Sequence, residues 1–284
     1  MAVRELPSRA VGKWREDGFV ALLSAASSRV RQAARRVRVR RAYRRTSLGA
    51  DVIDVDPGSI THFLIEGRHP ATSYRTEKGL ITKHELSKAY FPVQFFGGRV
   101  VPGEWDRHRK PYRFDRVYSA FADHYLDGVD WMETEYAQHM LLMGELYDVQ
   151  AVEQRIGICE SLYRSMLRDG YEPSSDPTRN VPVNVGRDGT LIFNNWEGHH
   201  RLALAKVLGI DRIPVFVVVR HERWEAIREV VASAASVDDL DERERRHLDH
   251  PDVRPLHEFD RRDRPSNSPR TPDTSPWSAG RSLS

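Results

Sequence analysis

The sequence predicts an α+β protein in which a mixed β-sheet carries flanking helices and a largely helical insertion. Three observations lead to this fold class. Residues 181–221 pass through a strand, a turn, a second strand, a loop, a helix and a third strand in quick succession. Residues 51–55 alternate as a separate strand, and residues 148–170 carry the apolar spacing of a long helix. Strands and helices thus both contribute to the predicted domain, as an α+β class requires.

The first two strands of residues 181–221 are predicted to form a hairpin. Val181–Val185 alternates apolar and polar residues, and Thr190–Phe193 resumes a strand after a short turn. The turn residues Arg187-Asp188-Gly189 suit a hairpin, because glycine readily adopts the positive φ of tight turns.

A helix and a buried strand complete this unit. Leu202–Leu208 has helical spacing, and Gly209 follows as a C-cap. Pro214 then opens Val215–Val219, whose apolar, β-branched residues are typical of a strand covered on both faces.

The turn that leads into this helix, residues 197–201 with the sequence EGHHR, is the candidate site. A helix N-terminus has unpaired N–H groups and partial positive charge, so it binds anions. Two histidines and an arginine in the first turn favour phosphate, whereas an unliganded helix prefers Asp or Glu there. One alternative is an ordinary solvated helix start. The other is a metal site shared with His221, but the spacing of the histidines disfavours a metal site.

The motif Gly198-His199-His200-Arg201, the following Leu-Ala-Leu-Ala-Lys helix, Gly209 and the Ile213-Pro214 strand resemble the ParB N-terminal domain of the ParB/sulfiredoxin superfamily. The resemblance implies a nucleotide triphosphate bound at this corner. ParB proteins hydrolyse CTP there, sulfiredoxins use ATP, and free-serine kinases of the same fold transfer phosphate. Sulfiredoxins have a nucleophilic cysteine where this chain has His199, and the only cysteine here is Cys159, so sulfiredoxin activity is not expected.

The same resemblance places the domain at residues 46–235. It covers residues 51–58 and 148–221, with an insertion at residues 59–147 between them. The helix over 148–170 would match the family's helix that ends in glycine, because Gly170 precedes the hairpin.

The insertion has its own predicted elements. Val93–Phe96 looks like a strand, Phe114–Leu126 like an amphipathic helix, and Asp130 like the N-cap of another helix. Trp105 and Trp131 are expected in the core. Four carboxylates are weaker candidates for holding a metal or a substrate amine: Asp106, Asp130, Glu133 and Glu135.

Residues 1–45 form a basic N-terminal segment. Nine arginines fall between Arg29 and Arg45, and residues 18–50 contain no acidic side chain. A helical apolar stripe runs through Phe19, Leu23, Ala26, Val30, Ala33 and Val37. Such a helix suits an anionic membrane surface or non-specific nucleic acid, and the alternative is a helix packed on the domain through its Ala/Val stripe.

The remaining features bound the class of protein. Residues 236–284 are charged and then rich in serine and proline, which predicts a disordered tail. The net charge is +3 in 284 residues, and one cysteine excludes a disulfide scaffold and fits a reducing cytoplasm. The expected location is therefore cytoplasmic, with peripheral contact at a membrane as an addition.

Two functions compete. The first is an NTP-dependent phosphoryl-transfer enzyme, either a small-molecule kinase acting on an unknown substrate or an NTPase. Backbone groups of Gly198, His199 and His200, with the Arg201 side chain, would bind the phosphates of ATP or CTP, and Asn195 would contact the ribose or base. The second is a DNA-associated partition or nucleoid protein, or a nuclease, which binds DNA through the arginines. Sequence-specific reading is not expected, because no helix-turn-helix module follows the domain.

Catalytic roles follow from the same interpretation. His199 or His200 would add a donor to the charge that develops in phosphoryl transfer. Glu197 is the nearest carboxylate for Mg²⁺, which usually binds one or two carboxylates and the phosphates. Glu66 is a candidate general base, because related kinases place a carboxylate in that region of the fold. The oligomeric state has no signature in the sequence.

Overall fold

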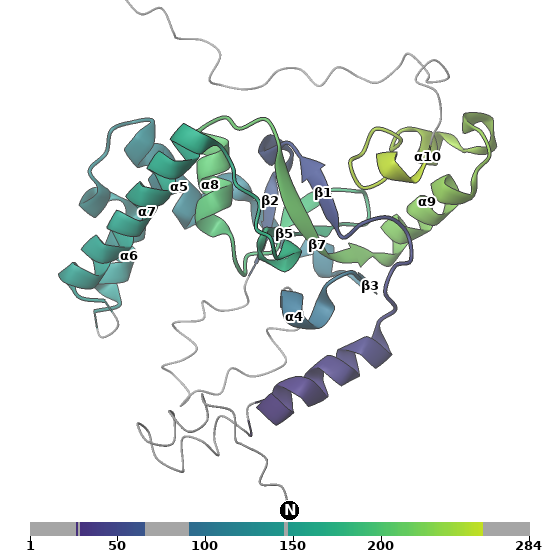
Figure 1. Ribbon diagram of the computed structural model, residues 1–284, viewed down its shortest axis with the longest axis horizontal. Helices are drawn as coiled ribbons and strands as arrows, with labels where there is room; N and C mark the ends of the chain where they lie inside the picture. Colours follow the sequence, from purple (N-terminus) through teal and green to yellow (C-terminus); the bar gives the residue numbers. More distant parts are fainter. Residues whose placement is uncertain (1–26, 28, 66–90, 145–146, 258–284) are drawn as a thin grey trace, which may run out of the picture.

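The computed structural model describes residues 27, 29–65, 91–144 and 147–257. Within these residues a seven-stranded mixed sheet is flanked by helices (Figure 1), which confirms the α+β fold class. Its strand order is β1-β7-β5-β6-β2-β4, and β3 also pairs with β7. The strands are β1 (Val52–Val55), β2 (His62–Leu64), β3 (Arg99–Val101), β4 (Arg109–Pro111), β5 (Val181–Val185), β6 (Leu191–Phe193) and β7 (Ile213–His221).

The longest strand, β7, organises the sheet. On one edge it pairs antiparallel with β1 and then parallel with β3, and on the other edge it pairs parallel with β5. Its side chains alternate between two cores, since Val215 and Val217 face one and Phe216 and Val218 face the other. Burial on both faces explains the unbroken apolar run that the sequence shows there.

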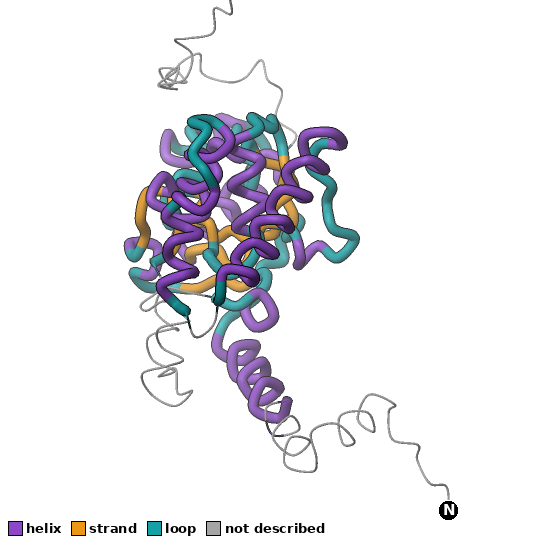
Figure 2. Tube along the Cα trace, turned by 90° about the vertical axis from the view of Figure 1, so that its left-hand side faces the viewer, coloured by secondary structure: helices purple, strands orange, loops and turns teal. Residues whose placement is uncertain are grey.

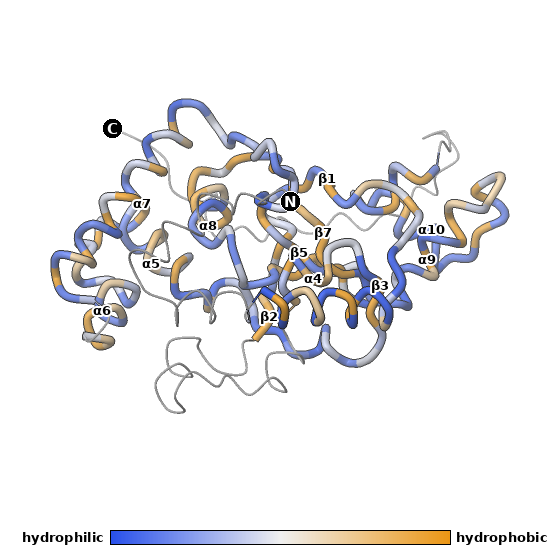
Figure 3. The backbone as a smooth tube through the Cα atoms, turned by 60° about the horizontal axis from the view of Figure 1, so that its bottom comes forward, coloured by the Kyte–Doolittle hydropathy of each residue, from blue (hydrophilic) through white to orange (hydrophobic). Residues whose placement is uncertain are grey.

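Helices cover both faces of the sheet. One core includes residues of α5 (Arg116–Tyr125), α7 (Val149–Asp169), α8 (His199–Val207) and α9 (Glu222–Ser233). The other core includes Val39 of the N-terminal helix and residues of the short helix α4 (Val93–Phe96). Figure 3 shows hydrophobic residues gathered on the central strands and hydrophilic ones along much of the outer helices.

Several local predictions are confirmed. The β5–β6 hairpin is antiparallel, and Gly189 in its turn has a φ of 85°. Helix α7 begins after Asp148, whose side chain accepts from the amide of Ala151, and ends at Gly170 with a φ of 77°. Trp105 and Trp131 are both buried, as core residues should be.

The predicted strand at Val93–Phe96 is wrong, because these residues form helix α4. The neighbouring side chains of Phe95 and Phe96 both enter the same core, which a helical turn permits and a strand, with successive side chains on opposite faces, does not. The strand of this region is β3, immediately after the turn at Gly97-Gly98.

The insertion is less separate than predicted. Strands β2, β3 and β4 lie between residues 59 and 147 and join the main sheet, so this segment is part of the domain and only partly helical. Asp130 caps a 3-10 turn, with its carboxylate 2.8 Å from the amide of Met132. Thr134 is the cap of the helix that follows, α6 (Glu135–Leu142).

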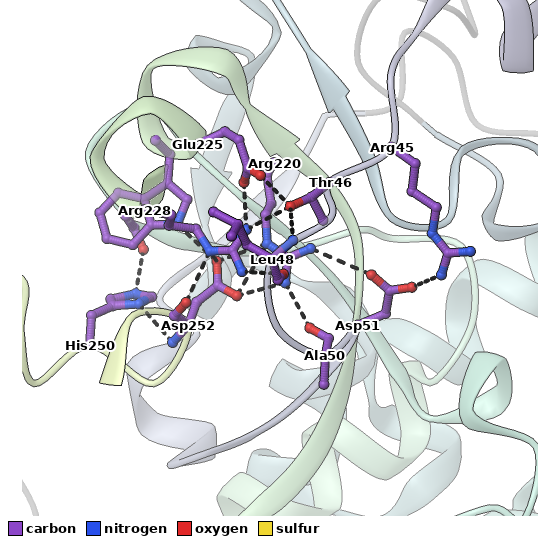
Figure 4. A network of polar contacts seen from close by, with 12 residues as sticks. Arg45, Thr46, Leu48, Ala50, Asp51, Arg220, Glu225, Arg228, His250 and Asp252 are labelled. Atoms are coloured by element: carbon purple, nitrogen blue, oxygen red, sulfur yellow. Dashed lines mark hydrogen bonds and ion pairs between the residues drawn. The ribbon is translucent and has the colours of Figure 1, made fainter. Parts of the chain in front are cut away.

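The chain keeps regular structure after residue 236, where the sequence predicts a disordered tail. Residues 237–256 contain helix α10 (Glu242–Arg245) between two 3-10 turns, and Leu248 and Val253 are buried. Asp252 forms ion pairs with Arg220 of β7 and Arg228 of α9 (Figure 4). A disordered tail from residue 236 is therefore wrong up to residue 257, and residues 258–284 lie outside the described residues.

The basic N-terminal helix spans residues 29–42 and extends from the rest of the described chain (Figure 2). Val39 is buried, whereas Val30 and Val37 of the predicted apolar stripe are 69% and 48% exposed. The helix thus packs through a different face from its Ala/Val stripe, and Phe19, Leu23 and Ala26 lie outside the described residues. Among the helices described, none combines the length and the apolar character that crossing a membrane requires.

Candidate functional site

The candidate site lies where the chain passes from β6 into α8. Gly198 is the N-cap of α8 and has a φ of 81°, a left-handed conformation that glycine adopts without strain. A Cβ there would lie 3.2 Å from the Cα of Val181 and 3.3 Å from Cδ of Pro182, so the site needs glycine for space as well. Gly198 brings no side-chain acceptor, and the first turn of α8 has no acidic residue. The corner therefore keeps the partial positive charge predicted for it.

The two asparagines before this corner hold the turn in place. Asn194 is fully buried and donates to the carbonyl of Phe91 and to Oδ1 of Asn184, each at 3.0 Å. Asn195 has a φ of 65° and donates to the carbonyl of Leu64 at 3.2 Å. The amide predicted to contact a ribose or base thus joins the corner to the end of β2.

His199 faces a carboxylate that the sequence did not single out. Its Nδ1 lies 3.7 Å from Oδ2 of Asp115 and is a buried atom without a hydrogen bond to any described residue, while the side chain as a whole is 29% exposed. The ring meets Phe193 edge-on, with the ring centroids 4.9 Å apart. Asp115 is itself fixed, because its Oδ1 accepts from the backbone amides of Val117 and Tyr118 at the start of α5. A positioned carboxylate beside a partly exposed imidazole is a common arrangement for proton transfer.

His200 has a different environment. It stacks on Phe121, with centroids 5.7 Å apart, and its Nε2 lies 3.2 Å from the hydroxyl of Tyr136. Burial, followed by the charges of Arg155 and His199, lowers the pKa of His200 to about 4. His200 is therefore neutral near pH 7 and connects α8 to α6, so the geometry favours His199 for chemistry.

Arg201, which the sequence predicts to bind phosphate, already has protein groups as partners. Its guanidinium donates to the carbonyl of Arg179 and lies over the ring of Tyr171, 5.8 Å from the centroid. Arg179 belongs to a short 3-10 turn, Pro177–Arg179, just before β5. A phosphate at the corner would have to replace the Arg179 carbonyl as the acceptor for Arg201.

Of the remaining predicted residues that the structure describes, Glu197 lies at the corner and His221 does not. Glu197 is exposed in the turn before α8, and Glu66 lies outside the described residues. His221 is buried, where it caps α9 and contacts the carbonyl of Gly103 at 2.8 Å. In the described ranges, no three His, Cys, Asp or Glu residues group as a protein-only metal site would need.

Three of the four weaker carboxylate candidates accept hydrogen bonds from other protein groups. Asp106 accepts from the side chain of Arg187, Asp130 caps its turn, and Glu135 accepts from Arg116. Cys159 is buried in α7, and burial raises the pKa of its thiol to about 11, which keeps it protonated and unreactive.

Comparison with known proteins adds no name to this site. No protein-family model, curated protein or solved structure matches the chain.

Of the residues at the corner, sequence reasoning missed Asp115. Its place just before an amphipathic helix is that of an N-cap, which was the available signal. Its approach to His199 depends on the packing of α5 against α8, which no local pattern contains.

Proposed function

We propose that this protein is a nucleotide-dependent phosphoryl-transfer enzyme, a small-molecule kinase or an NTPase, with its site at the N-terminus of α8. The observation that carries the proposal is the corner itself: a left-handed Gly198, no acidic residue in the first turn, and His199 beside Asp115. We further propose that this α+β fold is a ParB/sulfiredoxin-like domain. The succession of hairpin, glycine corner, helix and strand supports this assignment. A cytoplasmic location belongs to the same proposal.

The corner would bind the phosphates of ATP or CTP. Backbone N–H groups from Gly198 to His200 would donate to phosphate oxygens, and Arg201 would bind them after leaving the Arg179 carbonyl. The close approach of Gly198 to Val181 explains why only glycine suits the turn. Mg²⁺ would arrive with the nucleotide, and the exposed Glu197 would share it as a ligand.

His199 would handle the proton of the reaction. The attacking hydroxyl of water or of a small-molecule acceptor gives its proton to Nε2 of His199 as its oxygen bonds to the terminal phosphorus. The bond to the nucleoside diphosphate breaks at the same time, and the leaving oxygen keeps the electron pair. Asp115 faces Nδ1 and stabilises the imidazolium that forms. Glu66 stays the alternative base, and His200 would support the position of α8.

Arg201→Ala is expected to lower nucleotide affinity by about a hundredfold, because a charged hydrogen bond to phosphate contributes about 1.5–3 kcal/mol. Calorimetry with ATP and CTP in the presence of Mg²⁺ is the measurement. The matched control is Arg212→Ala, which removes an exposed arginine beyond the other end of α8. Unchanged affinity in Arg201→Ala would reject the phosphate corner.

His199→Gln is expected to slow phosphate release from the bound nucleotide by about 10²–10⁴-fold, the usual contribution of a general base, with affinity little changed. Asp115→Asn is expected to slow it less, by about tenfold, since asparagine still caps α5. Phosphate release under saturating nucleotide measures both. If His199→Gln retains the parent rate, another group is the base, with Glu66 as the next variant.

The competing function, non-specific nucleic-acid or membrane association, has one observation of its own. The helix at residues 29–42 extends from the domain, and its arginines are accompanied by the exposed side chains of Val30 and Val37. Basic residues next to exposed apolar ones suit an anionic membrane surface, and the arginines alone suit DNA phosphates.

A further inference from the structure

A basic cavity lies between the N-terminal helix and the sheet. Its volume is about 460 Å³, within the range of small-molecule sites. Arg36 and Arg40 reach it from the helix at residues 29–42, Arg45 follows that helix, and Arg99 comes from β3. These four arginines come from three separate parts of the fold, so the tertiary structure, more than the basic run alone, brings them together.

The charges around this cavity are unbalanced. Among the residues that the structure describes, four guanidinium groups line it, and Asp51 is the one carboxylate. That carboxylate already binds Arg45, and its other oxygen lies 3.6 Å from Nη1 of the buried Arg220. Arg36 donates from Nε to the carbonyl of Gln94 at 3.0 Å, which leaves its other donors available. The cavity therefore keeps an excess of positive charge.

Arg99 shows the consequence of this excess most directly. Among the described residues, its Nε is a buried atom with no hydrogen-bond partner, and its Nη1 has a long contact of 3.4 Å to the carbonyl of Tyr43. Burial, and then the neighbouring charges of Arg40 and Arg45, lowers the pKa of Arg99. A buried donor without an acceptor is unfavourable. The other nitrogens of this guanidinium, which lines the cavity, can donate to an anion there.

Apolar side chains form the rest of the wall. Val52, Val93 and Phe216 line the cavity beside the arginines. We propose that this cavity binds a small phosphorylated molecule with at least two negative charges, whose phosphate groups contact Arg40 and Arg99 and whose carbon part contacts the apolar wall. Arginine suits such a ligand because its planar donors bind phosphate oxygens in pairs.

Consecutive residues of the chain contact this cavity and the α8 corner. Pro177 and Thr178 line the cavity, and the next residue, Arg179, supplies the carbonyl that holds Arg201. The test must therefore separate the two sites, and it uses full-length Arg201→Ala protein, in which the α8 corner is disabled. A pyrophosphate titration by calorimetry in this background measures the cavity alone.

We expect Arg201→Ala protein to bind pyrophosphate, and the added Arg99→Gln substitution to weaken that binding about tenfold or more. Arg40→Gln, on the exposed helix, is expected to act in the same direction without risk to the sheet. The matched control is Arg38→Gln, which removes the same charge from the same helix outside the cavity lining and should change the affinity less than about twofold. Circular dichroism and melting temperatures establish that each variant is folded.

Three results would overturn the proposal. The first is no pyrophosphate binding to the Arg201→Ala protein. The second is an equal loss for Arg38→Gln and Arg99→Gln, which would mean diffuse attraction by the basic segment. The third is binding to phosphatidylcholine vesicles that contain phosphatidic acid without binding to pyrophosphate, since this would identify a lipid surface in place of a small-molecule cavity.

Discussion

Asp252→Ala is expected to lower the free energy of unfolding by about 3–5 kcal/mol, the usual cost of leaving buried charges without their partner. Asp252 is 2% exposed and accepts from Nε and Nη2 of Arg220 and from the indole of Trp224, at distances of 2.6–2.9 Å. Nε of Arg228 lies 3.3 Å from the same carboxylate. Figure 4 shows how these groups converge from β7, α9 and the C-terminal segment.

The reason for the large effect is that both arginines are almost completely buried. Arg220 is 0% and Arg228 is 1% exposed, so neither can turn to water when the carboxylate is removed. Glu225 also pairs with Arg228, but no second carboxylate among the described residues replaces Asp252 at Nε of Arg220. The same ion pairs attach residues 237–256 to the sheet, so their loss should also expose this segment to proteolysis.

Urea unfolding of Asp252→Ala and the parent protein measures this effect. Glu242→Ala, an exposed substitution in the same segment, is the control and should change stability by less than about 0.5 kcal/mol. The double variant Asp252→Ala/Arg220→Met should lose less than the sum of its single variants, because the charge and its partner leave together. A loss below about 1 kcal/mol for Asp252→Ala would show that water reaches the two arginines.

The sequence predicted best those elements that short-range rules determine. The β5–β6 hairpin, helix α7 and the Gly198 corner follow from alternation, caps and turn residues, all contained within a few neighbouring positions. Strand β7 was predicted for a similar reason, since burial on both faces leaves a continuous apolar run.

The incorrect predictions concern elements that long-range contacts determine. Helix α4 has four residues, too few for any period to be read, and its two phenylalanines are placed by the core beneath them. The C-terminal segment has the charged composition of a disordered tail, but in the folded chain some of these charges have buried partners. Asp252 meets Arg220 across 32 positions of sequence, and composition cannot show such pairing.

In the candidate site too, some features follow from the local sequence and others from long-range contacts. Gly198 and the basic residues after it were found locally, whereas the tertiary structure distinguishes the two adjacent histidines. His199 meets Asp115 of the α5 N-terminus, and His200 lies between Phe121 and Tyr136. The packing of α5 and α6 against α8 therefore decides which histidine is open to a substrate.

Acidification is expected to destabilise the protein through His200. The pKa of His200 falls to about 4 in the folded state, chiefly through burial, from an ordinary value of 6.5. Between these values the unfolded chain binds more protons than the folded one, so stability decreases as the pH falls. The contribution is complete above pH 6.5, and lowering the pH to about 5 should remove about 2 kcal/mol of it.

Urea unfolding at about pH 7.5 and about pH 5 compares the parent protein with His200→Gln. Glutamine cannot titrate, so the variant should lose about 2 kcal/mol less than the parent over this interval. His108→Gln, which removes an exposed histidine, is the control and should follow the parent. His247 and His250 have lowered pKa values through burial as well, so a residual pH dependence is expected in every variant.

An NMR titration of the His200 imidazole gives the direct measurement. A folded-state pKa near the ordinary 6.5 would mean that water reaches the ring, and it would contradict both the stacking on Phe121 and the assignment of His200 to a supporting role. A pKa near 4 would mean that His200 stays neutral near pH 7. In the proposed function, the positive charge at the α8 corner would then come from Arg201 and the helix N-terminus, so Arg201→Ala should remove a larger part of the binding energy than any substitution of His200.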